Sequence, residues 1–215
     1  MFSCRQILMM FLPICTALGL ADAQPVPSSR AAVADVPAIA FHGQDFALYK
    51  AEPILNGWSA YYTVNAQNSD SAPEEIIISH MDARDARGQV VLPAQVFRAM
   101  LDKVKSRGGT IIEPTFAVPD MTRPGDQYTY HAAFYYVYTK DRIGDIWMSR
   151  VFSTDNGVVG ILYRRTMGGS EPAALERDMR SWIAQNLVAY GDSLEAVVVP
   201  AQPYRPSSPS PQADR

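Results

Sequence analysis

Three segments in the first half of the chain have the hydrophobic pattern of β-strands, and the third of them is built on the consecutive residues Ile76, Ile77 and Ile78. The dipeptide Asn56-Gly57 precedes the second segment and is typical of a tight turn between strands. The pattern predicts strands over residues 46–50, 58–66 and 75–81.

A helical period replaces the alternation after the third strand. Apolar residues recur at three- and four-residue spacing from Val96 to Val104, with Pro93 near the start and Gly108-Gly109 at the exit. The next segment, residues 110–118, has the composition of a strand. Because Pro114 cannot donate a ladder hydrogen bond, we expect this strand at a sheet edge or a bulge.

The segment from residue 127 to residue 167 is the most informative part of the chain. It holds nine of the chain's 22 Phe, Trp and Tyr residues. The pattern predicts three antiparallel strands over 127–139, 145–154 and 158–167, with turns at 140–144 and at Asn156-Gly157.

The last periodic segment predicts a helix over residues 171–190, with Ser170 as its N-cap and Pro172 in its first turn. Glu176 and Arg180 are spaced to form an i, i+4 pair on its solvated side. The opposite side is an apolar stripe, which we expect to be buried on the aromatic sheet. The stripe comprises Leu175, Met179, Trp182, Ile183, Leu187 and Tyr190.

These elements indicate an α+β protein in which an antiparallel sheet packs with helices. Their order over residues 46–190 resembles that of the Mog1/PsbP-like α/β/α sandwich. The closing pattern is similar to exported bacterial members: an aromatic strand, then VFSTDNGVVGILYR at 151–164, then a helix with Trp182-Ile183. The resemblance implies an assembly, accessory or binding role and assigns no catalytic residue. A cystatin-like or NTF2-like curved sheet remains open as an alternative fold.

The N-terminus has the pattern of a secretory signal peptide. Arg5 precedes an apolar run over residues 7–20, and Ala21-Asp22-Ala23 provides an A-x-A cleavage site. The run is shorter than the ~20 residues of a membrane span, so we expect cleavage near Ala23, no integral span afterwards, and a periplasmic or secreted protein. Lipid anchoring at Cys15 is disfavoured, because Ile14 occupies the position where a lipoprotein signal has a small residue.

The remaining chain divides by composition. Residues 24–37 are rich in Ala, Pro and Ser and predict a flexible leader, residues 38–199 a single globular domain, and residues 200–215 a disordered Pro-rich tail. The two cysteines, Cys4 and Cys15, both lie in the signal peptide. The mature protein therefore has no disulfide and no thiolate nucleophile.

Charge and motifs narrow the classes of function. The chain has 19 basic and 22 acidic residues, a net charge of −3, without the basic excess of a nucleic-acid binder. It has no G-x-x-x-x-G-K-[ST], G-x-S-x-G or H-E-x-x-H motif. We therefore expect no cofactor, no metal site and no catalytic residue.

The histidines fit structural positions. Ser79 and His80 are neighbours on a predicted strand, so their side chains point to opposite faces and cannot readily share a proton. We expect His80 near the sheet rim, on the side of Ile76 and Ile78. His131 is expected to pack within the aromatic sheet.

One face of the sheet provides a candidate binding site. If the two late turns close tightly, Arg150 lies opposite both Tyr163 and Phe134, and Tyr136 lies nearby on the same face. Arg150 could stack on an aromatic ring or pair with an acid under a helix. It could instead bind the anionic group of a ligand or partner in a cleft rimmed by tyrosines. A one-residue slip in register would separate these residues.

The prediction is an exported, non-enzymatic binding or accessory protein of the bacterial envelope. Its partner would be a small apolar-anionic ligand or another envelope protein, and the sequence leaves its oligomeric state open. Two alternatives remain: an envelope hydrolase with an unrecognised acid/base pair that uses His80 or His131, and a secreted effector or immunity protein.

Overall fold

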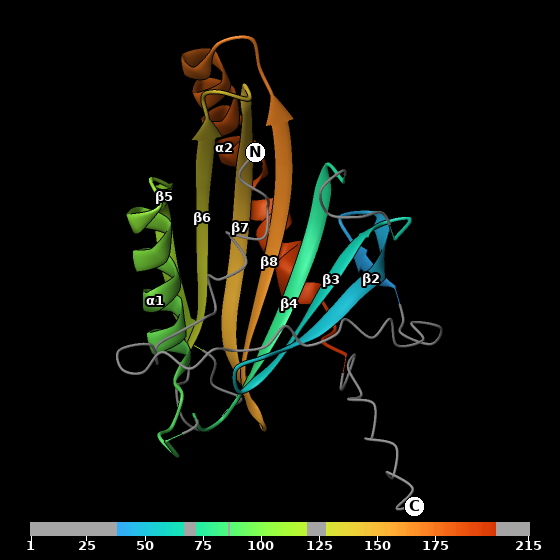
Figure 1. The fold of residues 1–215 in the computed structure, drawn as a ribbon, viewed down its shortest axis with the longest axis vertical. Helices are drawn as coiled ribbons and strands as arrows, with labels where there is room; N and C mark the ends of the chain where they lie inside the picture. The colour runs from blue at the N-terminus through green and yellow to red at the C-terminus, as the bar shows by residue number, and fades with distance from the viewer. Residues whose placement is uncertain (1–37, 67–71, 86, 120–127, 201–215) are drawn as a thin grey trace, which may run out of the picture.

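The computed structural model describes residues 38–66, 72–85, 87–119 and 128–200. Across these residues, eight antiparallel strands form one strongly twisted sheet with the order β1-β2-β3-β4-β8-β7-β6-β5, and two helices pack on it (Figure 1). The strands are β1 (Ile39–Phe41), β2 (Gln44–Ile54), β3 (Gly57–Val64), β4 (Glu74–Asp82), β5 (Thr110–Pro119), β6 (Tyr128–Tyr138), β7 (Ile143–Thr154) and β8 (Gly157–Gly168). The helices are α1 (Pro93–Ser106) and α2 (Pro172–Ala196).

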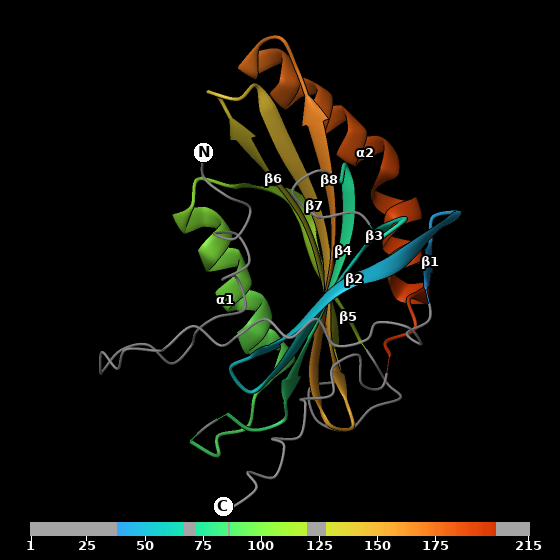
Figure 2. The same ribbon diagram turned by 45° about the vertical axis from the view of Figure 1, so that its right-hand side comes forward.

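The two helices cover opposite faces of the sheet, as Figure 2 shows. α2 packs on β6, β7, β8 and β1, over a face that includes Met148 and Tyr163, which we call the α2 face. α1 packs on β5 to β8, over a face that includes Phe134 and Trp147, which we call the α1 face. Alternation along each strand supplies both cores, since successive side chains point to opposite faces. The α+β class predicted from the sequence is confirmed.

The predicted elements are present, with differences at their ends. The three-residue strand β1 was not predicted, because so short a segment has no measurable period. The last helix has Glu171 rather than Ser170 as its N-cap and runs to Ala196 rather than residue 190. It extends because Leu194 continues the buried stripe beyond Gly191.

Both edges of the sheet carry features that discourage strand addition. β5 is an edge strand, and its pairing with β6 shifts in register between Ile112 and Phe116, around Pro114. The predicted edge position of Pro114 is therefore confirmed. At the other side, β1 pairs only with the start of β2. The remainder of β2 has a register shift between Leu48 and Lys50 and ends near Pro53.

Several predictions fall on other parts of the chain. The signal peptide at 1–23, the leader at 24–37 and residues 201–215 of the Pro-rich tail lie outside the described residues. In the part of the chain that the structure describes, neither helix combines the length and apolar composition required to span a membrane.

Candidate functional site

The turns between the late strands decide which predicted site residues meet. Across the β7–β8 turn, Thr154 pairs with Gly157, so the two-residue loop is Asp155-Asn156 and not Asn156-Gly157. Arg150 consequently lies opposite Ile161 rather than Tyr163. This correction is an even number of positions, so Arg150 and Tyr163 still share one face.

The pairing of β6 with β7 differs from the prediction by an odd number of positions. The connection is a four-residue loop between Tyr138 and Ile143, and Phe134 lies opposite Trp147 while His131 lies opposite Arg150. An odd shift transfers every side chain of β6 to the other face. The prediction that Phe134 and Tyr136 share a face with Arg150 is therefore wrong.

The three aromatic residues of the predicted site are all packed in the core. Phe134 stacks on Trp147 on the α1 face, with ring centroids 6.1 Å apart. On the same face, the Tyr136 ring packs so closely against Gly109 that a Cβ there would lie 2.7 Å from it. Tyr163 is on the α2 face, stacked on Phe41 at 5.0 Å. Burial raises the pKa of both the Tyr136 and the Tyr163 hydroxyl, so both stay neutral.

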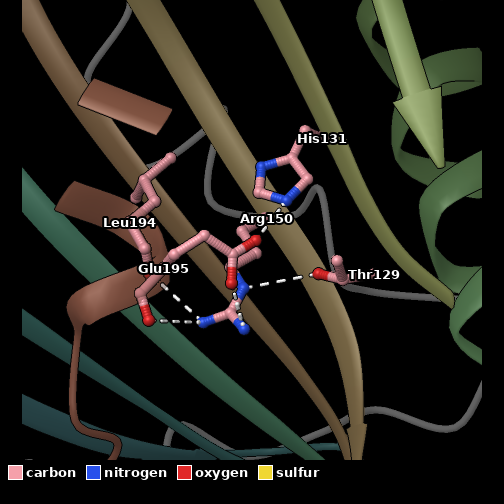
Figure 3. Close-up of polar contacts among 5 residues, drawn as sticks. All are labelled: Thr129, His131, Arg150, Leu194 and Glu195. Atoms are coloured by element: carbon pink, nitrogen blue, oxygen red, sulfur yellow. Dashed lines mark hydrogen bonds and ion pairs between the residues drawn. The ribbon is translucent and has the colours of Figure 1, made fainter. Parts of the chain in front are cut away.

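Arg150 is the centre of a polar cluster beneath the last turn of α2 (Figure 3). Its Nη2 lies 2.6 Å from Oε2 of Glu195, and the other carboxylate oxygen of Glu195 lies 2.6 Å from Nε2 of His131. Arg150 Nε also donates to the Thr129 hydroxyl at 3.3 Å. The guanidinium carbon is 4.0 Å from the centre of the Phe152 ring. Arg150 therefore has partners on β6, β7 and α2.

The position of the cluster at the C-terminal end of α2 explains why residue 150 is an arginine. The last carbonyls of a helix lack partners within the helix. Arg150 Nη1 donates to the carbonyl oxygens of Leu194 and Glu195, at 3.3 Å each. A cation at a helix C-terminus also interacts favourably with the helix dipole. Arg150 thus caps α2 and joins it to the sheet.

His131 is buried beside this cation. Burial lowers the pKa of the His131 ring below its usual value, Glu195 opposes that shift, and Arg150 adds to it. The ring is therefore neutral at pH 7, with its Nε2 hydrogen donated to Glu195. Arg150 and Glu195 then balance in charge. The expectation that His131 packs within the sheet is confirmed.

A small pocket adjoins the cluster between α2 and the sheet. Its volume of about 20 Å³ is enough for about one water molecule. Pockets for organic ligands measure roughly 300–1,000 Å³, so this one cannot hold a ligand of that kind. It is lined by His131, Ala132, Met148, Ser149, Leu187, Gly191 and Leu194.

His80 and Ser79 occupy opposite faces, as predicted. The His80 ring is parallel to that of Trp58, with centroids 5.7 Å apart, and its Nδ1 lies 3.9 Å from Oδ1 of Asp82. Burial lowers the pKa of His80, and Asp82 opposes that shift. Ser79 instead shares a hydrogen bond of 2.7 Å with the Ser59 hydroxyl. The two residues therefore form no catalytic pair.

A second polar arrangement on the α1 face was not predicted. Arg164 and Glu75 face each other across β8 and β4, and Arg164 Nε lies 3.5 Å from Oε2 of Glu75. Both side chains are buried, and the Tyr49 hydroxyl donates to the other oxygen of Glu75 at 3.0 Å. The sequence signal for this pair was Glu75, an acid at the start of the apolar segment 75–81. Its partner Arg164 could not be predicted, because the pair forms only when β4 lies beside β8.

Glu195 was missed for a different reason. It follows Gly191, beyond the predicted end of the last helix, although Leu194 continues the apolar stripe four residues after Tyr190. Among the described residues, no group of three or more His, Cys, Asp or Glu is placed to hold a metal ion. No protein-family model and no curated protein matches this chain in sequence, so its role is inferred from its own residues and geometry.

Proposed function

We propose that this chain is an exported protein of the bacterial envelope that acts by binding, as an accessory protein for another envelope protein or as a carrier of a small apolar-anionic ligand. The supporting observation is that the polar side chains which could serve as an acid, a base or a nucleophile are bonded to one another. Arg150, His131 and Glu195 hold one another at the end of α2. Ser79 is hydrogen-bonded to Ser59 on the other face of the sheet.

The test is native mass spectrometry of the protein expressed with its own N-terminus and purified gently from the periplasm. We expect a polypeptide mass that begins at Gln24, accompanied by a small bound molecule or a co-purified envelope protein. Retention in the cytoplasm with residues 1–23 attached would contradict export. A hydrolytic turnover that one point mutation abolishes would contradict a purely binding role.

The contact between His131 and Glu195 favours one alternative, an envelope hydrolase. A histidine 2.6 Å from a carboxylate has the geometry of a general base and its orienting group. Against this, Arg150 occupies the second carboxylate oxygen and the adjoining pocket is the size of a water molecule. A broad hydrolase screen of His131→Ala and His80→Ala decides the matter, because rates equal to those of the unaltered protein would eliminate this alternative.

A further inference from the structure

One carboxylate, that of Glu195, joins the last turn of α2 to two strands of the sheet. Glu195 contacts His131 of β6 with one oxygen and Arg150 of β7 with the other, both at 2.6 Å (Figure 3). Arg150 also binds the final carbonyl groups of the helix. The attachment of this turn therefore depends on a cluster of titratable and charged groups in addition to the packing of Leu194.

The charges around His131 balance only while its ring is neutral. Among the described side chains, the charged groups that face it include Arg150 from β7 and Glu195 from α2, and the backbone of β5 pairs Phe116 with it in register. A proton on the ring would leave two cations sharing one carboxylate. The side chains of His131 and Arg150 are only 8% and 11% exposed, so water reaches the additional charge mainly through the Glu195 carboxylate, which is 42% exposed, and offsets it only in part.

We propose that the cluster of His131, Arg150 and Glu195 is an acid-sensitive latch, whose protonation at His131 releases the last turn of α2 and the segment 197–200 that follows it. Release would uncover the apolar surfaces of Leu194 and Val197, which are buried in the latched state. The latch goes beyond the proposed function, since it is a property of the fold and does not depend on which partner binds.

The direction of the pH effect follows from the His131 environment. Burial lowers the pKa of the latched ring, whereas a released ring in water has the usual value of about 6.5. Protons therefore bind more tightly to the released state. The latch is complete above about pH 6.5 and is lost as the pH falls toward the lowered pKa of the latched ring.

Hydrogen exchange of the mature protein at about pH 7.5 and about pH 5, corrected for the intrinsic rate, tests the proposal. We expect protection of the amides of residues 193–197 to fall on acidification by up to about tenfold per pH unit, the limit for one proton. Amides in the centre of β7 should keep their protection. Equal protection of residues 193–197 at both pH values would overturn the latch.

Two matched variants separate His131 from a general effect of acid. His131→Gln removes the titrating ring and retains an N–H donor for Glu195, so the pH dependence should disappear. His80→Gln alters a second histidine whose pKa burial lowers, next to Trp58 and Asp82, and should leave the dependence intact. The opposite result in either variant would refute the assignment to His131.

A measurement on the unaltered protein covers the case in which His131→Gln does not fold. The His131 ring can be titrated directly by NMR. Its midpoint should lie below about 6.5 and should coincide with the loss of protection at residues 193–197. Two clearly separate midpoints would show that another group releases the helix.

Discussion

The face of the sheet under α2 buries an almost wholly apolar core, whereas the face under α1 buries the ion pair of Glu75 and Arg164. Among the described residues, the buried polar side chains of the α2 face are Thr129 and His131, next to the end of the helix. On the α1 face they are Ser59, Thr63, Glu75, Ser79, Asp145, Ser149 and Arg164.

The difference follows from the two helices and from cross-strand pairing. α2 has 25 residues and packs on β6, β7, β8 and β1, whereas α1 has 14 residues and packs mainly on β5 to β8. The polar groups of the α1 face bond to one another instead, as with Thr166 and Asp145 at 2.6 Å. The same strands can therefore bury apolar side chains on one face and polar side chains on the other, provided that the polar side chains pair across neighbouring strands.

The largest expected effect comes from breaking the ion pair of the α1 face. Arg164→Met leaves the Glu75 carboxylate buried without its cation and should reduce the free energy of unfolding by about 3–5 kcal/mol, measured by urea denaturation. The double variant Glu75→Met/Arg164→Met should recover most of that loss, because both charges are then absent. A single variant as stable as the unaltered protein would show that the pair is not buried in solution.

Truncation in the apolar core tests the α2 face. Met179 of α2 is fully buried against the sheet, so Met179→Ala should cost about 2–5 kcal/mol of unfolding free energy through lost contacts and the cavity left behind. The exposed neighbour Arg177 serves as the control, and Arg177→Ala should change stability by less than about 0.5 kcal/mol. Similar losses in both variants would mean that α2 does not pack as described.

Arg150 distinguishes a structural role from a binding role. Arg150→Met removes the cap of α2 and the partner of Glu195, so we expect a loss of about 1–3 kcal/mol with partner or ligand binding retained. Thermal unfolding and native mass spectrometry measure the two effects, and Arg98→Met, at an exposed position on α1, is the control. Binding lost with an unchanged thermal midpoint would instead support the role predicted from the sequence, which stays a prediction.

The smallest effect concerns two glycines near α2. Gly191 lies within the helix, and apart from its chain neighbours and the helix backbone no described atom would lie within 4 Å of a Cβ at this position, so Gly191→Ala should stabilise the protein by about 1 kcal/mol. At Gly144 on β7, a Cβ would instead clash with Met179 Sδ and the Tyr136 carbonyl oxygen. Gly144→Ala should therefore lower the thermal midpoint, and midpoints that moved in the same direction would contradict the packing of α2.

Periodicity was sufficient to predict most elements and insufficient to predict the site. The apolar stripe from Leu175 to Tyr190 was recognisable because a helix repeats every three to four residues. The partners of Arg150 were not, because the register of β6 on β7 depends on a four-residue loop whose length the turn residues did not reveal. Glu195 also required the true end of α2.

The sequence by itself determined which residues share a face within each strand and each helix, because those relations follow from local backbone geometry. Only the tertiary structure decided which faces of neighbouring strands coincide. Side chains alternate with a period of two, so a shift of three residues between the expected and the observed pairing of β6 with β7, an odd number, separates Phe134 from Arg150 and brings His131 beside it. The meeting of His131, Arg150 and Glu195 therefore depended on strand pairing and helix length together.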